Sequence, residues 1–489
     1  MASATNWRTR PEAPPRPRED VSISPSAQLL ALLALSLPYL LLGWLTQTSL
    51  FLGDSYAHLL ARTLVALGDG RLENVVLGYP LIPSLLAALR PAPSTLMIGA
   101  ALTAGATLWL LWRTLAAAPM NVIARLVLLF AFAVVPTTTF LATQSFGEML
   151  ALFLFVIAWN NYVAFARTNT TWKGFVAGLL IGLAFFVNLY ALVYGLILIL
   201  FAPFYLYDRR AGSFRQQRAR ILTGTVVIAF PALASFLAWT YLSWLFTGDP
   251  FSYVRDVISP LSAFADSASA PLLGWSAVLN ASLSDVLRLP LYLAVGIVTI
   301  VCAPHRFLTL LMPLLVIVVT RALGWAYTEP FALATLTVVA LVGLPLHKRL
   351  AWLLIPAALL QIAFAYGLAD RSTEQTDWRN VLFTDAPTLQ AQTEAQIAAR
   401  LAVAPPHSVL IDSSANDRLI ARMGTALPLM DADNAAYELA TSAPAQYVDF
   451  IVIIDGDQLA QRFDLAPPQG FILDTSWSGG RLYRRADLS

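Results

Sequence analysis

Charged side chains are scarce in this chain of 489 residues, where Asp, Glu, Lys and Arg make up 12% of the sequence. A soluble domain carries about 25% of such residues. The shortage is concentrated between Ala27 and Ala369, where charges fall mostly in short clusters between apolar runs. This pattern excludes an ordinary soluble globular protein. The net charge of +2 gives no reason to expect a nucleic-acid partner.

Cysteine and lysine are also nearly absent. The single cysteine, Cys302, lies in an apolar run, which excludes an internal disulfide and argues against redox chemistry. Lys173 and Lys348 are the only lysines beside many Arg and Ala, a bias typical of bacteria with GC-rich genomes. After Ala369 the chain has no GxGxxG sequence, no Walker sequence and no metal-spaced Cys/His set.

Long apolar runs dominate the rest of the sequence. A membrane-spanning helix needs about 20 predominantly apolar residues. Roughly eleven runs approach this length, and they cover residues 27–47, 94–114, 122–142, 147–166, 172–186, 188–207, 221–245, 287–303, 307–321, 330–346 and 350–369. We therefore predict an α-helical polytopic membrane protein with about 11 transmembrane helices.

The stretch from Phe175 to Tyr207 is either one bent helix or a hairpin of two helices. This choice decides on which side of the membrane every later loop lies. With a hairpin, most Arg and Lys gather on one side, which the positive-inside rule makes cytoplasmic. The other side then receives only Arg62, Arg71, Arg90, Arg255, Arg288 and Arg321. One bent helix would scramble this bias. We therefore predict two helices, a cytoplasmic N-terminus and an extracytoplasmic C-terminus, in a bacterial cytoplasmic membrane.

Three regions are expected. Residues 1–25 are rich in Pro and Arg, and the apolar run after them is long enough to span and is not followed by a small-residue cleavage site, so they are predicted to be a disordered cytoplasmic tail. Residues 26–369 form the transmembrane domain. Its first outer loop, 50–93, contains two apolar stretches too short to span, Ser55–Leu67 and Pro80–Leu89, which are predicted to be interfacial helices. A second long outer loop is expected from Thr247 to Val286.

Residues 370–489 have the mixed pattern of a small extracytoplasmic α/β domain. Helices are predicted at Thr388–Val403, Asn416–Met423 and Asp457–Phe463, and strands at Ser408–Asp412, Val448–Ile454, Gly470–Thr475 and Arg481–Arg484. Because no catalytic set is recognisable in it, the domain is expected to bind acceptor or to close over a site built elsewhere.

Ionisable groups near the membrane are costly to bury, so each is a candidate for function. Asp54 follows the first run and recurs with His58 and Arg62 at helical intervals of four, so the three share one face. Glu148 opens the fourth run, which the topology places at the same outer face as Asp54. A carboxylate beside an imidazole can abstract a proton or hold a divalent cation. The simpler alternatives are that Asp54 caps its helix and that Glu148 complements a helix dipole.

Arg321 ends the ninth run, shortly before Tyr327. An arginine at the outer end of a span can bind a phosphate through two hydrogen bonds, or it can extend towards lipid headgroups. Both roles fit this position.

Several short motifs resemble the GT-C superfamily of polyprenyl-phosphate-sugar-dependent integral membrane glycosyltransferases. An aspartate and an amphipathic loop helix follow the first span, and Gly78–Leu86, which includes Tyr79, is similar to the superfamily's second loop helix. Ser145-Phe146-Gly147-Glu148 resembles its second acidic motif, and Gly178–Phe185 its glycine-spaced fifth span. The order of the spans also matches, so the resemblance covers nearly the whole chain. Ser55 follows Asp54 where the superfamily often has an acidic residue.

The resemblance implies inverting transfer of a sugar, a hexose or a pentose, from a polyprenyl-phosphate donor to an extracytoplasmic glycan, lipid or protein. Asp54 and Glu148 would be catalytic and Arg321 would bind the donor phosphate. Supporting roles would fall to His58, Arg62, Tyr79 and Tyr327. A divalent cation, Mg or Mn, would be held by Asp54, Glu148 and His58, although Ser55 leaves this requirement open.

Two other function classes remain. A transporter or lipid flippase would show inverted repeats and polar groups at mid-membrane, whereas the two halves of this chain are not similar and its ionisable groups cluster at one face. A non-catalytic scaffold of the same fold is the third class, and the presence of both Asp54 and Glu148 argues against it.

Overall fold

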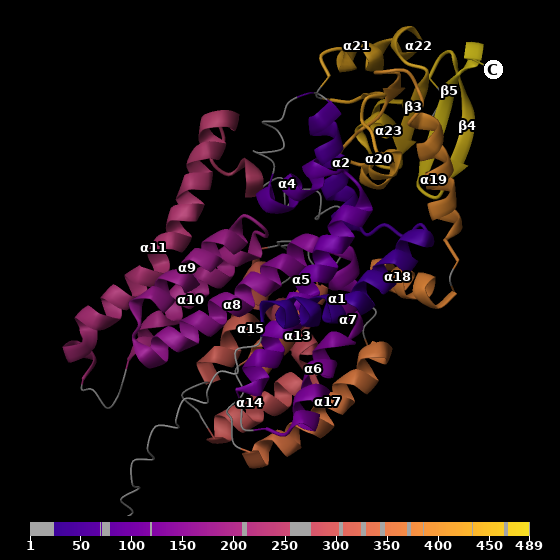
Figure 1. Cartoon of the computed structure of the whole chain (residues 1–489). Coiled ribbons are helices and arrows are strands. Elements are labelled where there is room, and N and C mark those ends of the chain that lie inside the picture. The colour runs from indigo at the N-terminus through magenta and orange to yellow at the C-terminus, as the bar shows by residue number, and fades with distance from the viewer. Residues whose placement is uncertain are drawn as a thin grey trace, which may run out of the picture.

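The computed structural model describes residues 24–68, 70, 79–117, 120–207, 213–254, 275–302, 307–323, 329–342, 348–368, 373–384, 386–432, 434–463 and 468–488. In Figure 1 a bundle of helices carries a small mixed domain, coloured orange to yellow, at one end. The tail predicted for residues 1–25 falls almost entirely outside the described residues.

Each of the predicted apolar runs contains at least one helix within the described residues. The helices are α1 (Pro25–Thr48), α5 (Pro93–Ala116), α6 (Val122–Ala133), α7 (Pro136–Gln144), α8 (Phe146–Thr168), α9 (Thr171–Phe185), α10 (Tyr190–Leu206), α11 (Phe214–Thr247), α14 (Pro290–Cys302), α15 (Phe307–Ala322), α16 (Glu329–Val342) and α17 (Lys348–Leu368). The predicted hairpin is confirmed, because α9 and α10 are separate helices.

Four of these helices, α1, α5, α8 and α11, are long and apolar enough to cross a membrane within the described residues. The number rises to six if each of two sharply bent pairs forms one span, while the other apolar helices are shorter. These helices make the chain a multi-pass membrane protein. The sidedness and the full count of about 11 spans remain predictions.

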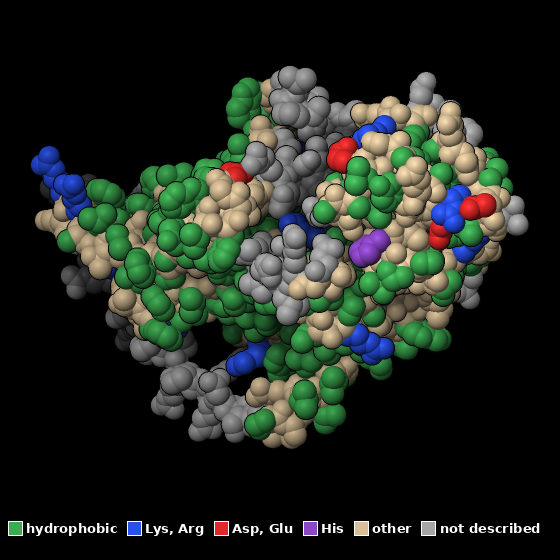
Figure 2. Space-filling view, turned by 90° about the horizontal axis from the view of Figure 1, so that it is seen from above, with side chains coloured by type: hydrophobic (Ala, Val, Ile, Leu, Met, Phe, Trp, Pro, Cys, Tyr) green, Lys and Arg blue, Asp and Glu red, His purple; other side chains and the backbone are tan. Residues whose placement is uncertain are grey.

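The surface of the bundle agrees with this assignment. Large apolar side chains such as Leu200, Phe230 and Leu237 are more than half exposed on α10 and α11. Figure 2 shows hydrophobic side chains spread over much of the face that the bundle presents. In water such a surface would be costly, whereas lipid tails solvate it.

Two bends depart from the predicted runs. The run 122–142 is broken at residues 134–135, where α6 and α7 meet at 60°; Pro136 starts α7, and a proline disfavours helix in the residue before it. The predicted long loop Thr247–Val286 contains a helix, α13 (Trp275–Leu287), which meets α14 at 94° just before Pro290. The sequence did not indicate this helix within the predicted outer loop.

Both predicted loop helices are present. The first is α2 (Asp54–Gly68), and the second is α4 (Leu81–Leu89). The buried face of α2 packs in part against the mixed domain, since Ala61 and Leu64 belong to that domain's apolar core. The loop helix thus joins the bundle to the domain.

The C-terminal part is a small α/β domain, as predicted. Its five-stranded sheet has the order β2-β1-β3-β5-β4, with β1 parallel to β2 and β3, and β5 antiparallel to β3 and β4. The strands are β1 (Val409–Leu410), β2 (Leu429–Met430), β3 (Phe450–Ile454), β4 (Phe471–Trp477) and β5 (Gly480–Arg485). The helices are α18 (Thr373–Thr384), α19 (Leu389–Leu401), α20 (Asp417–Met423), α21 (Tyr437–Ser442), α22 (Pro444–Tyr447) and α23 (Gln458–Phe463). The sequence did not indicate α18, β2, α21 or α22.

Candidate functional site

Asp54 is the first residue of α2, at the break between the first apolar helix and the amphipathic loop helix. Its carboxylate does not cap α2. Instead, Oδ1 accepts from Arg418 of α20, at 2.7 Å from Nε and 2.6 Å from Nη2. The structure therefore does not support the simpler alternative in which Asp54 caps its helix. The side chain of Asp54 instead forms an ion pair with the soluble domain.

The start of α2 meets the junction of α7 and α8. The backbone N–H of Gly53 donates to Oε1 of Gln144 at 3.3 Å, and the hydroxyl oxygens of Ser55 and Ser145 lie 3.4 Å apart. Glu148 is buried one turn beyond Ser145 in α8. The structure therefore brings together the two acidic motifs that are 94 positions apart in the numbering of the chain, Asp54 and Glu148.

A third carboxyl group joins this cluster. Oε1 of Glu374, on α18, accepts from the backbone N–H of Asp54 at 2.7 Å. A Cβ atom on Gly53 would lie 3.0 Å from the same oxygen, so a glycine there makes room for the approach. Burial and then the charge of Asp54 raise the pKa of Glu374 from 4.5 to about 8, with Glu148 contributing in the same direction and Arg418 opposing it. Glu374 is therefore largely a neutral acid at pH 7.

We expect Glu374→Gln to stabilise the protein relative to the wild type by an amount that grows as the pH rises from 5 to about 8 and is then constant up to pH 9. The folded chain holds its proton up to about pH 8, whereas the unfolded chain loses it near 4.5. Stability thus falls with pH across this window in the wild type, and glutamine removes the fall. The gain is at most about 1.4 kcal/mol for each pH unit, and less because the site is partly exposed. Thermal unfolding in detergent at both pH values measures it.

The matched control is Glu438→Gln, which changes an exposed carboxylate of the same domain whose side chain is 79% exposed. It should show no pH-dependent gain. An equal shift for Glu374→Gln at pH 5 and pH 9 would contradict the assignment of a neutral carboxyl group.

The supporting residues predicted on α2 point to different partners. His58 Nδ1 lies 2.8 Å from Oδ2 of Asp417, so it pairs with the soluble domain. Arg62 donates to the backbone carbonyl oxygen of Tyr79 at 3.2 Å. Tyr79 itself is buried and donates its hydroxyl to the carbonyl oxygen of Phe185 at 2.6 Å. These contacts give Arg62 and Tyr79 a place in the packing beside the site.

Arg321 lies apart from the acidic cluster in every contact that the structure describes. Its Nη2 donates to Oδ2 of Asp285 at 2.7 Å and its Nη1 to the hydroxyl of Ser282 at 3.1 Å, both on α13. The carboxylate of Asp285 is only 1% exposed. Tyr327 lies outside the described residues.

The predicted cation site is not assembled. In the described part of the chain no three His, Cys, Asp or Glu side chains form a group that could hold a metal ion. The guanidinium of Arg418 occupies Oδ1 of Asp54, and Asp417 engages His58. In this arrangement the positive charge next to Asp54 comes from an arginine, and the residues present do not fit a metal ion.

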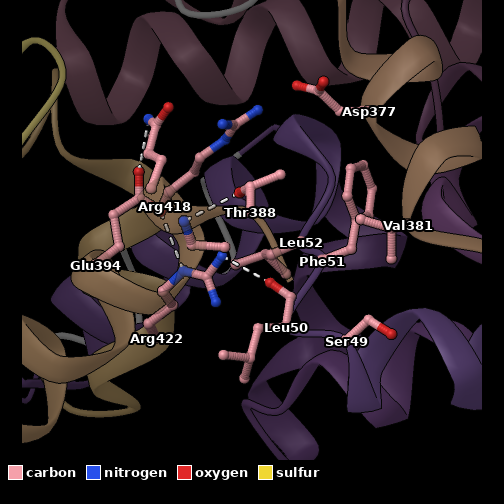
Figure 3. A pocket seen from close by; sticks show the side chains of 12 residues that line it. Ser49, Leu50, Phe51, Leu52, Asp377, Val381, Thr388, Glu394, Arg418 and Arg422 are labelled. Atoms are coloured by element: carbon pink, nitrogen blue, oxygen red, sulfur yellow. Dashed lines mark hydrogen bonds and ion pairs between the residues drawn. The ribbon is translucent and has the colours of Figure 1, made fainter. Parts of the chain in front are cut away.

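The soluble domain is attached to the loop before Asp54 through a second arginine. Figure 3 shows Arg422 and Arg418 beside this loop; Arg422 Nη2 donates to the carbonyl oxygen of Leu50 at 2.8 Å, and its Nε lies 3.2 Å from Oε2 of Glu394. Thr388 lines the same pocket, whose volume is about 40 Å³. That volume admits only a few water molecules, so this gap is no sugar site.

Sequence reasoning missed Glu374 and Arg418, the two side chains that contact Asp54. Both follow the last span, in a region without a catalytic motif. A signal was present for Glu374, because it closely follows the end of that span, which the predicted topology places at the outer face. No comparable signal marks Arg418, since its position depends on how α20 packs.

Comparisons with known proteins find similar architectures. No family model and no curated protein sequence matches the chain. Solved structures do match. One is an oligosaccharyltransferase of Archaeoglobus fulgidus in the apo form, which is 12% identical to this chain, with a TM-score of 0.42 over 87% of this chain and 69% of that one. A second is the same organism's oligosaccharyltransferase AglB with an inhibitory peptide and a dolichol-phosphate, with 14% identity and a TM-score of 0.40 over 94% and 74%.

The third similar structure is ArnT from Cupriavidus metallidurans in the apo state, with 12% identity and a TM-score of 0.40 over 94% of this chain and 98% of that one. At these scores the likeness concerns general architecture and transfers neither an activity nor a residue.

Proposed function

We propose that the chain is an inverting membrane glycosyltransferase that moves a sugar from a polyprenyl-phosphate donor to an extracytoplasmic acceptor. One observation carries the proposal. Asp54, at the end of the first apolar helix, lies in a cluster with Glu148, Glu374 and Arg418, and its side chain is 43% exposed. An accessible carboxylate at the border of an apolar bundle can serve a lipid-linked donor and a polar acceptor together.

In the proposed reaction Asp54 is the general base. Its carboxylate takes the proton from the acceptor hydroxyl, the hydroxyl oxygen attacks the anomeric carbon, and the bond from that carbon to the phosphate oxygen breaks. Polyprenyl phosphate leaves with the electron pair. A single displacement of this kind inverts the configuration at the anomeric carbon. No step requires a metal ion or a second enzyme nucleophile.

Other residues take supporting parts in this proposal. Glu148 orients the cluster from the α8 side. We assign the leaving phosphate to Arg321, whose described contacts are Asp285 and Ser282 on α13 rather than the acidic cluster. The acceptor is a glycan, a lipid or a protein, and the site opens on the outer face of a bacterial cytoplasmic membrane.

A comparison of donor classes tests the proposal. Purified protein in proteoliposomes is given labelled sugars, hexoses and pentoses, either as polyprenyl phosphates or as nucleotide sugars, together with a membrane extract as the source of acceptor. We expect the sugar to be transferred only from a polyprenyl phosphate. Transfer from a nucleotide sugar would contradict the proposal.

Glu148→Gln should lower kcat for this transfer, but by less than Asp54→Asn. Glutamine keeps the size and hydrogen-bonding oxygen of Glu148, so it preserves most of an orienting role while removing its charge. The measurement is kcat at saturating donor for both variants in the same lipid. If Glu148→Gln lost as much activity as Asp54→Asn, the two carboxylates would have to exchange or share the role of base.

A further inference from the structure

Arg418 holds Asp54 by one oxygen only. Both guanidinium nitrogens that reach the carboxylate, Nε and Nη2, contact Oδ1 at 2.7 and 2.6 Å. The described residues make no hydrogen bond or ion pair with Oδ2, and the side chain of Asp54 is 43% exposed. An arginine pair that served only to neutralise a carboxylate would be expected to bind both oxygens. Here one oxygen is fixed, and the other has no described hydrogen-bond partner.

The backbone beside this carboxylate is fixed as well. The N–H of Asp54 donates to Glu374, and the N–H of Gly53 donates to Gln144. With the backbone fixed, the Asp54 carboxylate can still rotate about its side-chain bonds, and the contact with Arg418 restricts this rotation. A base held in one orientation reacts faster because the cost of ordering is already met before the substrate binds.

Arg418 is itself held firmly by the packing of α20 on α2, which lie side by side in Figure 1. Asp417 contacts His58, Arg422 contacts Leu50, and Ala421 belongs to the apolar cluster that contains Leu60. These contacts flank Arg418 on both sides in the sequence.

The charge of Arg418 is secure in this position. Burial alone would lower its pKa, but the carboxylates of Asp54, Glu374 and Glu394 outweigh burial and raise the pKa above its ordinary value. The side chain is thus a permanent cation beside Asp54.

We propose that Arg418 of the soluble domain is a positioning residue, which fixes Asp54 through Oδ1 so that Oδ2 faces the acceptor hydroxyl. The proposal rests on the proposed function, in which Asp54 is the base. It makes the soluble domain part of the site, whereas the sequence predicted only acceptor binding or closure for that domain. The contrary possibility is a plug: an arginine that masks Asp54 until the domain moves away.

Variants of Arg418 separate these roles. Arg418→Gln should lower kcat for sugar transfer by about tenfold to a hundredfold, the loss expected for a charge-assisted hydrogen bond, with a smaller change in the KM for donor. Arg418→Lys should restore part of kcat, because the charge remains while the two-nitrogen geometry is lost. Guanidinium chloride, at a concentration that does not denature, should raise the activity of Arg418→Gly.

Arg462→Gln is the matched control, since it removes another arginine–carboxylate pair of the same domain, between Arg462 and Glu438 at 3.2 Å. It should keep wild-type kcat. A purely structural role for Arg418 predicts no rescue by guanidinium and no partial recovery with lysine.

Three results would overturn the proposal. Higher activity of Arg418→Gln would show that Arg418 is a plug, unchanged activity would show that the contact is idle, and a loss that neither lysine nor guanidinium relieves would make the arginine structural. In each of these cases Asp54→Asn tests the role of Asp54 as the base independently. Full activity of Asp54→Asn would contradict the proposed function. An inactive Asp54→Asn would support the proposed function even if Arg418 has no positioning role.

Discussion

Replacing Asp54 by Asn is expected to lower the rate of sugar transfer by at least roughly 10²-fold, the low end of what a general base contributes. Asparagine has nearly the shape of aspartate, and its amide oxygen can still accept from Arg418, so the fold of the α2–α20 contact should survive. It cannot take a proton from a hydroxyl group. The measurement is release of polyprenyl phosphate per unit time by purified protein in proteoliposomes.

Asp377→Asn is the control for this variant. Asp377 is an exposed aspartate on α18, the helix that carries Glu374, and none of its described contacts involves Asp54. It should transfer sugar at the wild-type rate. If Asp54→Asn also kept more than about a tenth of the wild-type rate, it would fall outside the range for a lost general base, and Asp54 would be a structural partner of Arg418.

The second large effect concerns the packing of the bundle. Gly178→Ala should destabilise the folded protein by about 1–3 kcal/mol, the usual cost of forcing extra atoms into a packed interior. A Cβ at Gly178 would overlap the carbonyl oxygen of Ile228, so α9 and α11 would have to separate. Small residues allow such close approach in membrane helices. The yield of monodisperse protein and its thermal unfolding in detergent measure the loss.

Gly296→Ala provides the same chemical change in another apolar helix, α14. A Cβ at Gly296 meets no atom within 4 Å. Because alanine favours helix over glycine by about 1 kcal/mol, this variant should be as stable as the wild type or slightly more stable. Equal destabilisation by both substitutions would show that the α9–α11 crossing is not the cause.

The helical bundle could be predicted from the sequence because helices that lie in lipid need long runs of apolar residues. Each long apolar run is helical over most of its described length, and the distribution of arginine separated α9 from α10 correctly. The elements that were missed have weaker sequence patterns. Strand β2 has two residues, which is too short to show the alternation of apolar and polar residues that marks a strand. Helix α18 buries Gln375, Trp378 and Val381, so most of its sequence is polar and gives no clear helical pattern of apolar residues.

The candidate site divides in the same way. Asp54 and Glu148 could be placed at one face because each lies at the end of an apolar run, so topology alone brings them near. Arg418 could not be placed, because its contact with Asp54 depends on how α20 packs on a loop helix, and for Glu374 the sequence offered only its position soon after the last span. The same limitation applies to Arg321, whose pairing with Asp285 depends on the unforeseen helix α13.

The most direct measurement of the central claim is an analysis of the products of one lipid-linked sugar. Wild-type protein in proteoliposomes is incubated with a labelled polyprenyl-phosphate sugar and acceptor extract, and the lipids of both leaflets are examined by mass spectrometry. We predict free polyprenyl phosphate together with a glycosylated acceptor, both lost in Asp54→Asn. Intact lipid-linked sugar arriving in the opposite leaflet, with no polyprenyl phosphate formed, would identify a flippase and contradict the account.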